Sequence, residues 1–313
     1  MILKPDSVQT IPFGDDVLII NKRIIPDDAV ATKYVADYVK KGSPMKPCKR
    51  FTMGKPHGIV IHNTSDIVTS AETTPAEQYS RATYPNCNMG GVMVHFYADK
   101  SCAWQNLDLR EQGWHASDGS STRRAHSGAY SVFVGGNVDC IAIEIIGTDG
   151  EETGAKLAAY IMYMFNLKIN DIYTHNYFMY GKDEIVPDAK KNCPIYILGH
   201  WQKFLDKVQC YYNKLCKAMY DEVSAAVTPD SPDAELGFEF VVQCGSFTVK
   251  ANAEKLAEKA RKELNVRVRI MPVKVLGVRY YRVMLSDFNT YREAEAYMKY
   301  IKSMGYEGAV IVL

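Results

Sequence analysis

The sequence contains no long hydrophobic run, no regular cysteine pattern and no signal-peptide pattern. No stretch of its 313 residues approaches the roughly eighteen apolar residues of a membrane-spanning helix. Residues 1–16 lack the apolar stretch that follows a basic start in a signal peptide, so we expect synthesis in the cytoplasm without one. The eight cysteines are irregularly spaced, without a CxxC pair, which argues against a disulfide scaffold and predicts mostly buried thiols.

The composition supplies enough apolar material for two hydrophobic cores. Hydrophobic residues make up 47% of the sequence and charged residues 23%. A chain of 313 residues is long enough for two domains. The net charge of +1 conceals an asymmetry, because residues 237–313 hold 13 Lys and Arg against 8 Asp and Glu. A basic C-terminal segment on an acidic remainder favours an anionic or polymeric partner for that segment.

Strand and helix patterns alternate over residues 1–223, which predicts an α/β domain with an N-terminal extension. Thr74, Pro75 and Glu77 form a helix-start signature, with a cap, a first-turn proline and a third-position glutamate. Strands are predicted at 17–20, 58–62, 92–98 and 141–146, and helices at 27–40, 74–83, 154–167 and from Pro194 to about Val223.

A second predicted domain follows a segment without periodicity. Residues 224–236 contain two prolines and two serines, which is typical of a linker. Residues 237–313 then follow the order βαββαβ, which predicts an α+β, ferredoxin-like domain. Its strands are expected at 238–242, 266–272, 279–285 and 308–312, and its helices at 251–264 and 291–304.

Glu144 interrupts an otherwise apolar predicted strand at 141–146. An isolated buried carboxylate is costly, so this one pairs with a cation, binds a ligand or is protonated. A glutamate at the rim of the strand with a salt-bridge partner explains the pattern equally well. His62 ends another predicted strand, where α/β sheets place active groups, although a single histidine is more often structural.

His62, His175 and Cys193 are residue types that bind zinc, and one thiolate with two imidazoles is a plausible ligand set. The 17 residues between His175 and Cys193 match no local zinc-finger spacing. The sequence lacks the GxSxG motif of a serine hydrolase, and Cys193 lacks the local signature of a papain-like nucleophile. The chemistry of these residues is therefore compatible with a zinc site, but it does not by itself identify these three residues as the ligands.

Six short segments, in order along residues 50–222, resemble the zinc-dependent N-acetylmuramoyl-L-alanine amidases of the amidase-2 type. This family includes phage endolysins and is related to the peptidoglycan recognition proteins, so the resemblance implies a mixed central sheet flanked by helices. Each segment alone is weakly specific, whereas six in the family's order are highly specific. The segments are 58–64, 94–99, 113–118, 141–147, 174–175 and 191–194.

The resemblance assigns roles to individual residues. It implies that His62, His175 and Cys193 bind Zn²⁺, with a fourth position left for water. Glu144 stands at the position of the catalytic acid/base, and Lys191 at that of the residue that stabilises the oxyanion. The resemblance also implies substrate-binding positions at Asn63, Thr64, Trp114 and His115.

The interval between His175 and Cys193 is longer than is usual in the family, through an insertion around residues 179–189. Asp183 and Asp188 lie in or beside this insertion and compete as ligands. We favour Cys193 because Lys191 and Pro194 flank it as the family pattern requires.

Residues 237–313 resemble a SPOR domain, a module that binds glycan strands stripped of their peptide stems. The resemblance rests on 241–247 with 252–254 and on 281–288 with 293–294, and it implies glycan contacts from Gln243, Ser246 and Phe247. Ser286 and Asp287 depart from the Gly-Pro that is common in the family. A generic ferredoxin-like module that binds RNA or protein is the alternative, but RNP-type aromatic motifs are missing.

The two resemblances together imply a peptidoglycan hydrolase that cleaves between N-acetylmuramic acid and L-alanine, most simply an endolysin released by a holin. We expect no nucleic-acid partner and no membrane insertion, and action on the cell wall after lysis or release. The alternatives are a non-catalytic peptidoglycan-binding protein, a cysteine peptidase, and an amidase of sporulation or mother-cell lysis.

Overall fold

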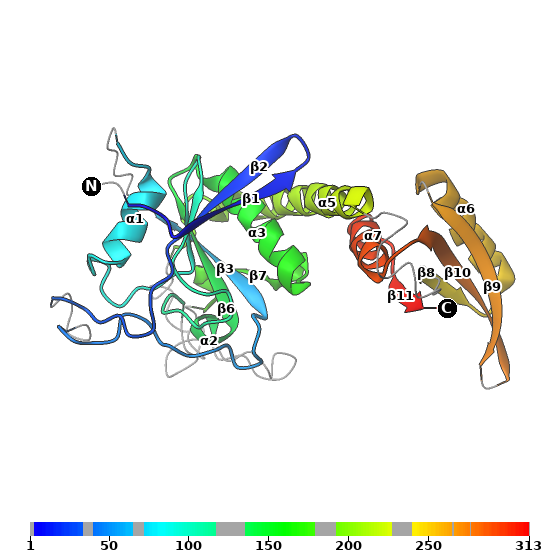
Figure 1. Ribbon diagram of the computed structural model, residues 1–313, viewed down its shortest axis with the longest axis horizontal. Coiled ribbons are helices and arrows are strands. Elements are labelled where there is room, and N and C mark those ends of the chain that lie inside the picture. Colours follow the sequence, from blue (N-terminus) through cyan, green and yellow to red (C-terminus); the bar gives the residue numbers. More distant parts are fainter. Residues whose placement is uncertain are drawn as a thin grey trace. The chain divides into compact units, whose positions relative to one another are not determined.

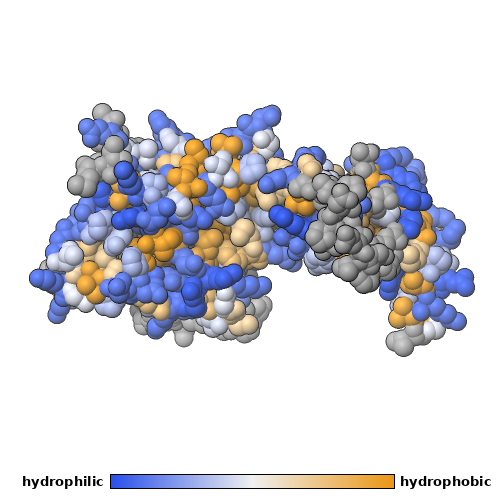
Figure 2. All heavy atoms as spheres, in the orientation of Figure 1, coloured by the Kyte–Doolittle hydropathy of each residue, from blue (hydrophilic) through white to orange (hydrophobic). Residues whose placement is uncertain are grey.

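The chain forms two compact units, Met1–Tyr212 and Asn213–Leu313, whose boundary falls within one long helix. The computed structural model describes residues 3–33, 40–64, 72–116, 135–178, 192–226, 240–264, 266–275 and 277–312 (Figure 1). The visible surface is mostly hydrophilic, with hydrophobic side chains gathered in patches (Figure 2). Within the described residues, every helix is too short or too polar to cross a membrane.

The first unit is built on a seven-stranded sheet. Its strands are β1 (Ser7–Phe13), β2 (Asp16–Lys22), β3 (Gly58–Thr64), β4 (Phe96–Ala98), β5 (Ala103–Gln105), β6 (Cys140–Ile146) and β7 (Ile172–Thr174). They are ordered β1-β2-β5-β4-β6-β3-β7. The pairs β3/β6, β3/β7, β4/β6 and β2/β5 are parallel, whereas β1/β2 and β4/β5 are antiparallel. The expected α/β class with a mixed sheet is therefore confirmed.

The first helix of this unit begins where the sequence predicts it. The hydroxyl of Thr74 accepts a hydrogen bond of 3.3 Å from the N–H of Glu77, so the predicted cap starts the first helix. The helices are α1 (Pro75–Thr83), α2 (Gly136–Asp139), α3 (Glu151–Phe165), α4 (His175–Phe178) and α5 (Trp201–Ala226), the last of which continues into the second unit.

The two faces of the sheet carry different helices. On one face, Ala76 of α1 packs in a cluster with Ala142 of β6. On the other, α3 lies so close that a Cβ atom on Gly154 would be 2.3 Å from Cδ1 of Ile145. Because side chains alternate between faces along a strand, Glu144 shares the α1 face with Ala142.

The expected helix at 27–40 is wrong for its described part, residues 27–33, and 34–39 lie outside the described residues. This segment pairs with a distant one, since the N–H of Ala31 donates to Ser43 and the N–H of Met45 donates to Ala29. These tertiary bonds replace the bonds within a helix. The expected strand at 92–98 is shortened to β4, and strand β1 was not predicted.

The second unit has the predicted βαββαβ order, which confirms its α+β class. Its elements are β8 (Phe240–Phe247), α6 (Lys250–Glu263), β9 (Arg267–Val275), β10 (Val278–Phe288), α7 (Tyr291–Ser303) and β11 (Ala309–Val312). The antiparallel sheet has the order β11-β8-β10-β9. Alanines on α6 and Ala294 and Ile301 on α7 pack with the sheet residues Val242 and Leu285 in one core.

The end of α5 belongs to this second core. Tyr220 packs against it, with ring centroids 4.7 Å from Tyr297 and 5.9 Å from Tyr300. The hydroxyl of Ser224 donates to the Glu293 carboxylate over 3.3 Å. The first three residues of the expected linker are therefore helical, and residues 227–236 lie outside the described residues.

Candidate metal centre and active site

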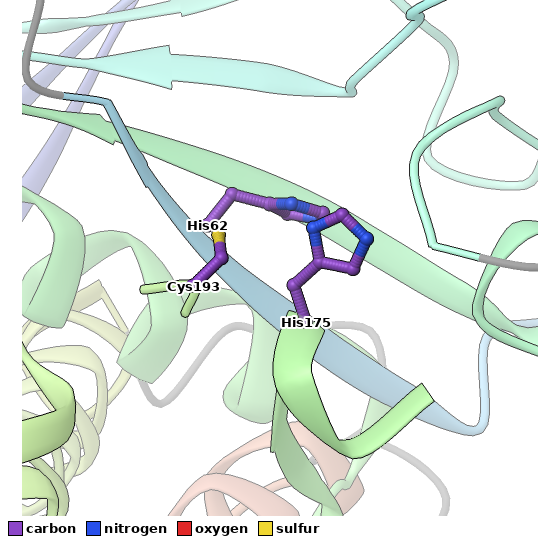
Figure 3. A group of neighbouring side chains, drawn as sticks. All are labelled: His62, His175 and Cys193. Atoms are coloured by element: carbon purple, nitrogen blue, oxygen red, sulfur yellow. The ribbon is translucent and has the colours of Figure 1, made fainter. Parts of the chain in front are cut away.

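His62, His175 and Cys193 converge in the first unit although they are far apart in the sequence. His62 lies on β3, His175 is the first residue of α4, and Cys193 follows a segment outside the described residues (Figure 3). One donor atom from each lies within 4.8 Å of the others, and all three side chains are buried. Two imidazole nitrogens and one sulfur match the donor types and number of a catalytic zinc site with one open position.

Parallel pairing of β3 and β6 brings the predicted acid/base to this centre. In the register of the two strands, His62 lies opposite Glu144, and Tyr97 of β4 lies opposite Glu144 on its other side. Residues opposite each other in adjacent strands point to the same face. Glu144 is also the one position of β6 that is not fully buried, and it shares a face of the sheet with His62.

Two hydrogen bonds connect the ligand-bearing segments to each other. The backbone N–H of Asn176, next to His175, donates to the carbonyl of Cys193 over 2.8 Å. The backbone N–H of Tyr196 donates to the side-chain oxygen of Asn63, next to His62, over 2.9 Å. The segment of Cys193 is thus bonded to α4 beside His175 and to β3 beside His62.

His115 contacts the candidate ligand His62 directly. Its Nδ1 lies 3.2 Å from Nε2 of His62, and its Nε2 lies 3.2 Å from the carbonyl oxygen of Cys140. Burial lowers the pKa of His115 well below its usual value, and the nearby His95 and His175 lower it further.

His95 has a structural role, because both of its ring nitrogens bond backbone groups. Its Nδ1 accepts the N–H of Ala142 over 3.1 Å, and its Nε2 donates to the carbonyl of Glu111 over 2.8 Å. Complete burial lowers its pKa to about 4, so the ring is neutral at pH 7.

Comparisons with known proteins agree with this geometry. A family model described as N-acetylmuramoyl-L-alanine amidase matches residues 52–195, and a SPOR domain model matches residues 237–312. The chain carries an amidase-2 domain and a SPOR domain. His62, Glu144, His175 and Cys193 all lie within the amidase match.

Two relatives that match the amidase domain come from Bacillus subtilis. The N-acetylmuramoyl-L-alanine amidase CwlH of Bacillus subtilis (strain 168) is 29% identical over 157 residues, which cover 49% of this chain and 53% of CwlH. The amidase XlyA of the same organism is 25% identical over 176 residues, which cover 54% of this chain and 49% of XlyA. The chain thus spans about half the length of these relatives. A solved mutant endolysin from Bacillus subtilis has 23% identity and a TM-score of 0.43, over 61% of this chain and 99% of that one.

The structure places the expected substrate-binding residues of the amidase domain in different surroundings. Trp114 is half-buried, exchanges backbone hydrogen bonds with Met93 and packs against a hydrophobic cluster that contains Met45. Thr64 ends β3, with its hydroxyl 3.2 Å from that of Tyr79. Asn63 is buried and its amide bonds backbone groups. Their substrate contacts stay predictions.

Other predicted positions of the amidase domain lie outside the described residues. These are Lys191, the competing ligands Asp183 and Asp188, and the insertion at 179–189. The prediction that Lys191 stabilises the oxyanion therefore rests on the family resemblance alone.

Two contacts around His115 could not be predicted from the sequence. The side-chain oxygen of Asn137 accepts the backbone N–H groups of His115 and Ala116, each over 2.6 Å. Asn137 lies in the short helix α2, 22 residues from His115, and no local pattern links the two residues. The direct contact of His115 with His62 was equally unforeseen, because it joins residues 53 positions apart.

In the SPOR domain, the three expected glycan contacts lie on β8. Ser246 is exposed and pairs in register with Arg282 of β10. Gln243 is half-buried, and Phe247 is half-buried against the domain core. Ser246 and Arg282 together offer hydroxyl and guanidinium groups at the sheet surface, and glycan binding by these residues stays a prediction.

Proposed function

We propose that the protein is a zinc-dependent N-acetylmuramoyl-L-alanine amidase that hydrolyses the amide bond between the lactyl group of N-acetylmuramic acid and L-alanine of the peptide stem. The observation that carries this proposal is the convergence of His62, His175 and Cys193, with Glu144 opposite His62 on the adjacent strand. The family match over the same residues supports the choice of bond.

Residues of the chain supply the proton transfers of this reaction. A zinc ion held by the three ligands would polarise the scissile carbonyl and acidify the attacking water. The Glu144 carboxylate accepts a proton from that water as the new C–O bond forms, and then delivers it to the departing nitrogen of L-alanine as the C–N bond breaks. The resemblance assigns Lys191 to the negative charge that develops on the carbonyl oxygen.

We further propose that the SPOR domain directs the enzyme to glycan strands that have lost their stems. Each cut would then create a docking site beside the enzyme and raise its local concentration. Release by a holin, as in a phage endolysin, and release by mother-cell lysis both fit this arrangement, and the site of action stays a prediction.

Digestion of purified cell walls tests the bond specificity. The full chain should release new N-terminal alanine without new reducing sugar, and a chelator should abolish this until zinc is restored. New reducing ends would instead identify a glycosidase. Activity that survives chelation but not thiol alkylation would favour a cysteine peptidase with Cys193 as nucleophile.

The SPOR proposal has its own test, independent of catalysis. Full chain carrying Glu144→Gln should bind walls stripped of stems by another amidase more tightly than intact walls. Equal binding to both, or tighter binding to RNA, would contradict glycan targeting while leaving the amidase proposal untouched.

A further inference from the structure

His115 connects the backbone of one central strand to a metal ligand on the next. Its Nε2 lies 3.2 Å from the carbonyl oxygen of Cys140 on β6, and its Nδ1 lies 3.2 Å from Nε2 of His62 on β3. The sequence had suggested a substrate contact for this residue. Its ring nitrogens are instead engaged by the protein, and the residue is buried, with 8% of its surface exposed.

The hydrogens in this chain of contacts can be assigned from the partners. A carbonyl oxygen only accepts, so Nε2 of His115 carries the hydrogen that it donates to Cys140. With that hydrogen on Nε2, the neutral tautomer of His115 presents a lone pair at Nδ1. Across the 3.2 Å contact this lone pair accepts a hydrogen from Nε2 of His62, and Nδ1 of His62 is then the nitrogen with a lone pair.

The position of His115 is fixed from several sides. Asn137 accepts its backbone N–H over 2.6 Å. Its ring centroid lies 5.2 Å from that of His62, at 83° between planes, and 6.1 Å from that of His95. A Cβ atom on Gly113 would lie 2.5 Å from the Met93 carbonyl oxygen and 3.1 Å from the His115 ring. A side chain at position 113 would therefore displace the His115 ring.

We infer that His115 is a positioning residue that holds His62 in its Nε2–H tautomer and thereby directs Nδ1 of His62 to the metal. Hydrogen bonds from a ligand imidazole to a second protein group fix ring orientation and raise ligand basicity, and their loss typically lowers metal affinity by roughly 10- to 100-fold. The inference rests on the metal site of the proposed function, but not on the identity of the bond that is cut.

The test compares zinc affinity and tautomer in three full-length variants. His115→Phe keeps the ring volume without an acceptor, His115→Asn offers a carbonyl oxygen near the position of Nδ1, and His200→Gln is a matched control at a partly exposed histidine that binds Glu151. Zinc dissociation constants come from competition with a chromophoric chelator. Two-bond ¹H–¹⁵N spectra of the metal-free proteins report which nitrogen of His62 carries hydrogen.

We expect zinc affinity to fall roughly 10- to 100-fold in the Phe variant, to fall less in the Asn variant and to stay unchanged in the control. The wild type should show His62 as the Nε2–H tautomer, and the Phe variant a mixture. Three results would each overturn the inference. The Phe variant could bind zinc as tightly as the wild type, or the Asn variant could bind it no more tightly than the Phe variant. The spectrum of the wild type could also show the hydrogen of His62 on Nδ1. If the Phe variant does not fold, the spectrum of the wild type still tests which tautomer His62 adopts. A wild type that binds zinc in this way but cuts no cell wall would contradict the proposed function alone.

Discussion

The side-chain oxygen of Asn63 accepts a hydrogen bond of 2.9 Å from the backbone N–H of Tyr196. The nitrogen of the same amide donates to the carbonyls of Ile145 and Gly147, over 2.7 and 3.0 Å. One side chain therefore ties the end of β3, the end of β6 and the segment that follows Cys193. Its neighbour in the sequence is the ligand His62.

We predict that Asn63→Ala weakens zinc binding about tenfold, because the segment that carries Cys193 loses its bond to the sheet. The free energy of unfolding should fall by about 1–3 kcal/mol, since buried backbone groups lose their partner. Chelator competition and urea unfolding measure the two effects. Asn289→Ala is the matched control at an exposed asparagine, and equal behaviour of the two variants would contradict the prediction.

Glu144→Gln should retain zinc and wall binding but lose turnover by roughly 100-fold or more, because the amide cannot accept the proton of the attacking water. Release of N-terminal alanine measures the rate, and metal analysis measures bound zinc. A near-normal rate would reduce Glu144 to a structural residue of β6.

Replacing any ligand should remove the metal. His62→Ala, His175→Ala and Cys193→Ala should each lower zinc content and abolish wall lysis, since two remaining ligands hold zinc poorly. Asp188→Ala should behave as the wild type. Full activity in the Cys193 variant, with an inactive Asp188 variant, would show that the insertion shifts the third ligand.

The buried imidazole of His95 should make the domain less stable in acid. Its pKa is about 4 in the folded protein and about 6.5 when unfolded, so between these values only the unfolded chain binds the proton. Stability is thus fully present above about pH 6.5 and falls by up to about 1.4 kcal/mol per pH unit on acidification toward pH 4. Urea unfolding between pH 7 and 5 should show a shallower decline for His95→Gln than for the wild type. Parallel declines would mean that His95 does not cause the effect.

The last turns of α5 should stabilise the SPOR domain. Tyr220 packs on Tyr297 and Tyr300, and Ser224 bonds Glu293, so a fragment of residues 213–313 should unfold at a higher temperature than one of 237–313. In the longer fragment, Tyr220→Ala should remove about 2–4 kcal/mol of that stability through lost packing. Calorimetry of the two fragments measures the difference in unfolding temperature. Identical unfolding temperatures would show that the end of α5 does not stabilise the SPOR domain.

Local sequence patterns were sufficient to predict the helix and strands that position the candidate site. The apolar runs of β3 and β6 and the cap at Thr74 are short-range signals, and the structure follows them. The family motif supplied His175 and Cys193 as partners of His62, which spacing alone could not select.

Contacts between distant segments were beyond such patterns. Asn63 and Tyr196 are 133 residues apart, and nothing in the sequence around either residue predicts their hydrogen bond. The segment at 27–33 has helical periodicity, yet the carboxylate of Asp27 lies 2.6 Å from the buried Lys46 ammonium. Backbone bonds to residues 43–45 hold the segment in turns and bends, with one β-bridge between Val30 and Pro44. Tertiary partners there outweigh a weak helical preference.

The wide separation of the ligands along the chain has a consequence for the protein's lifetime. A zinc ion that joins β3, α4 and the segment at Cys193 would act as a removable cross-link across long loops, and cross-links of that kind restrict the unfolded chain most strongly. Because the unfolded chain does not present these ligands together, stability would rise with the logarithm of free zinc. Under the proposed zinc dependence, a shortage of zinc would therefore lower both the activity of the enzyme and its resistance to proteolysis.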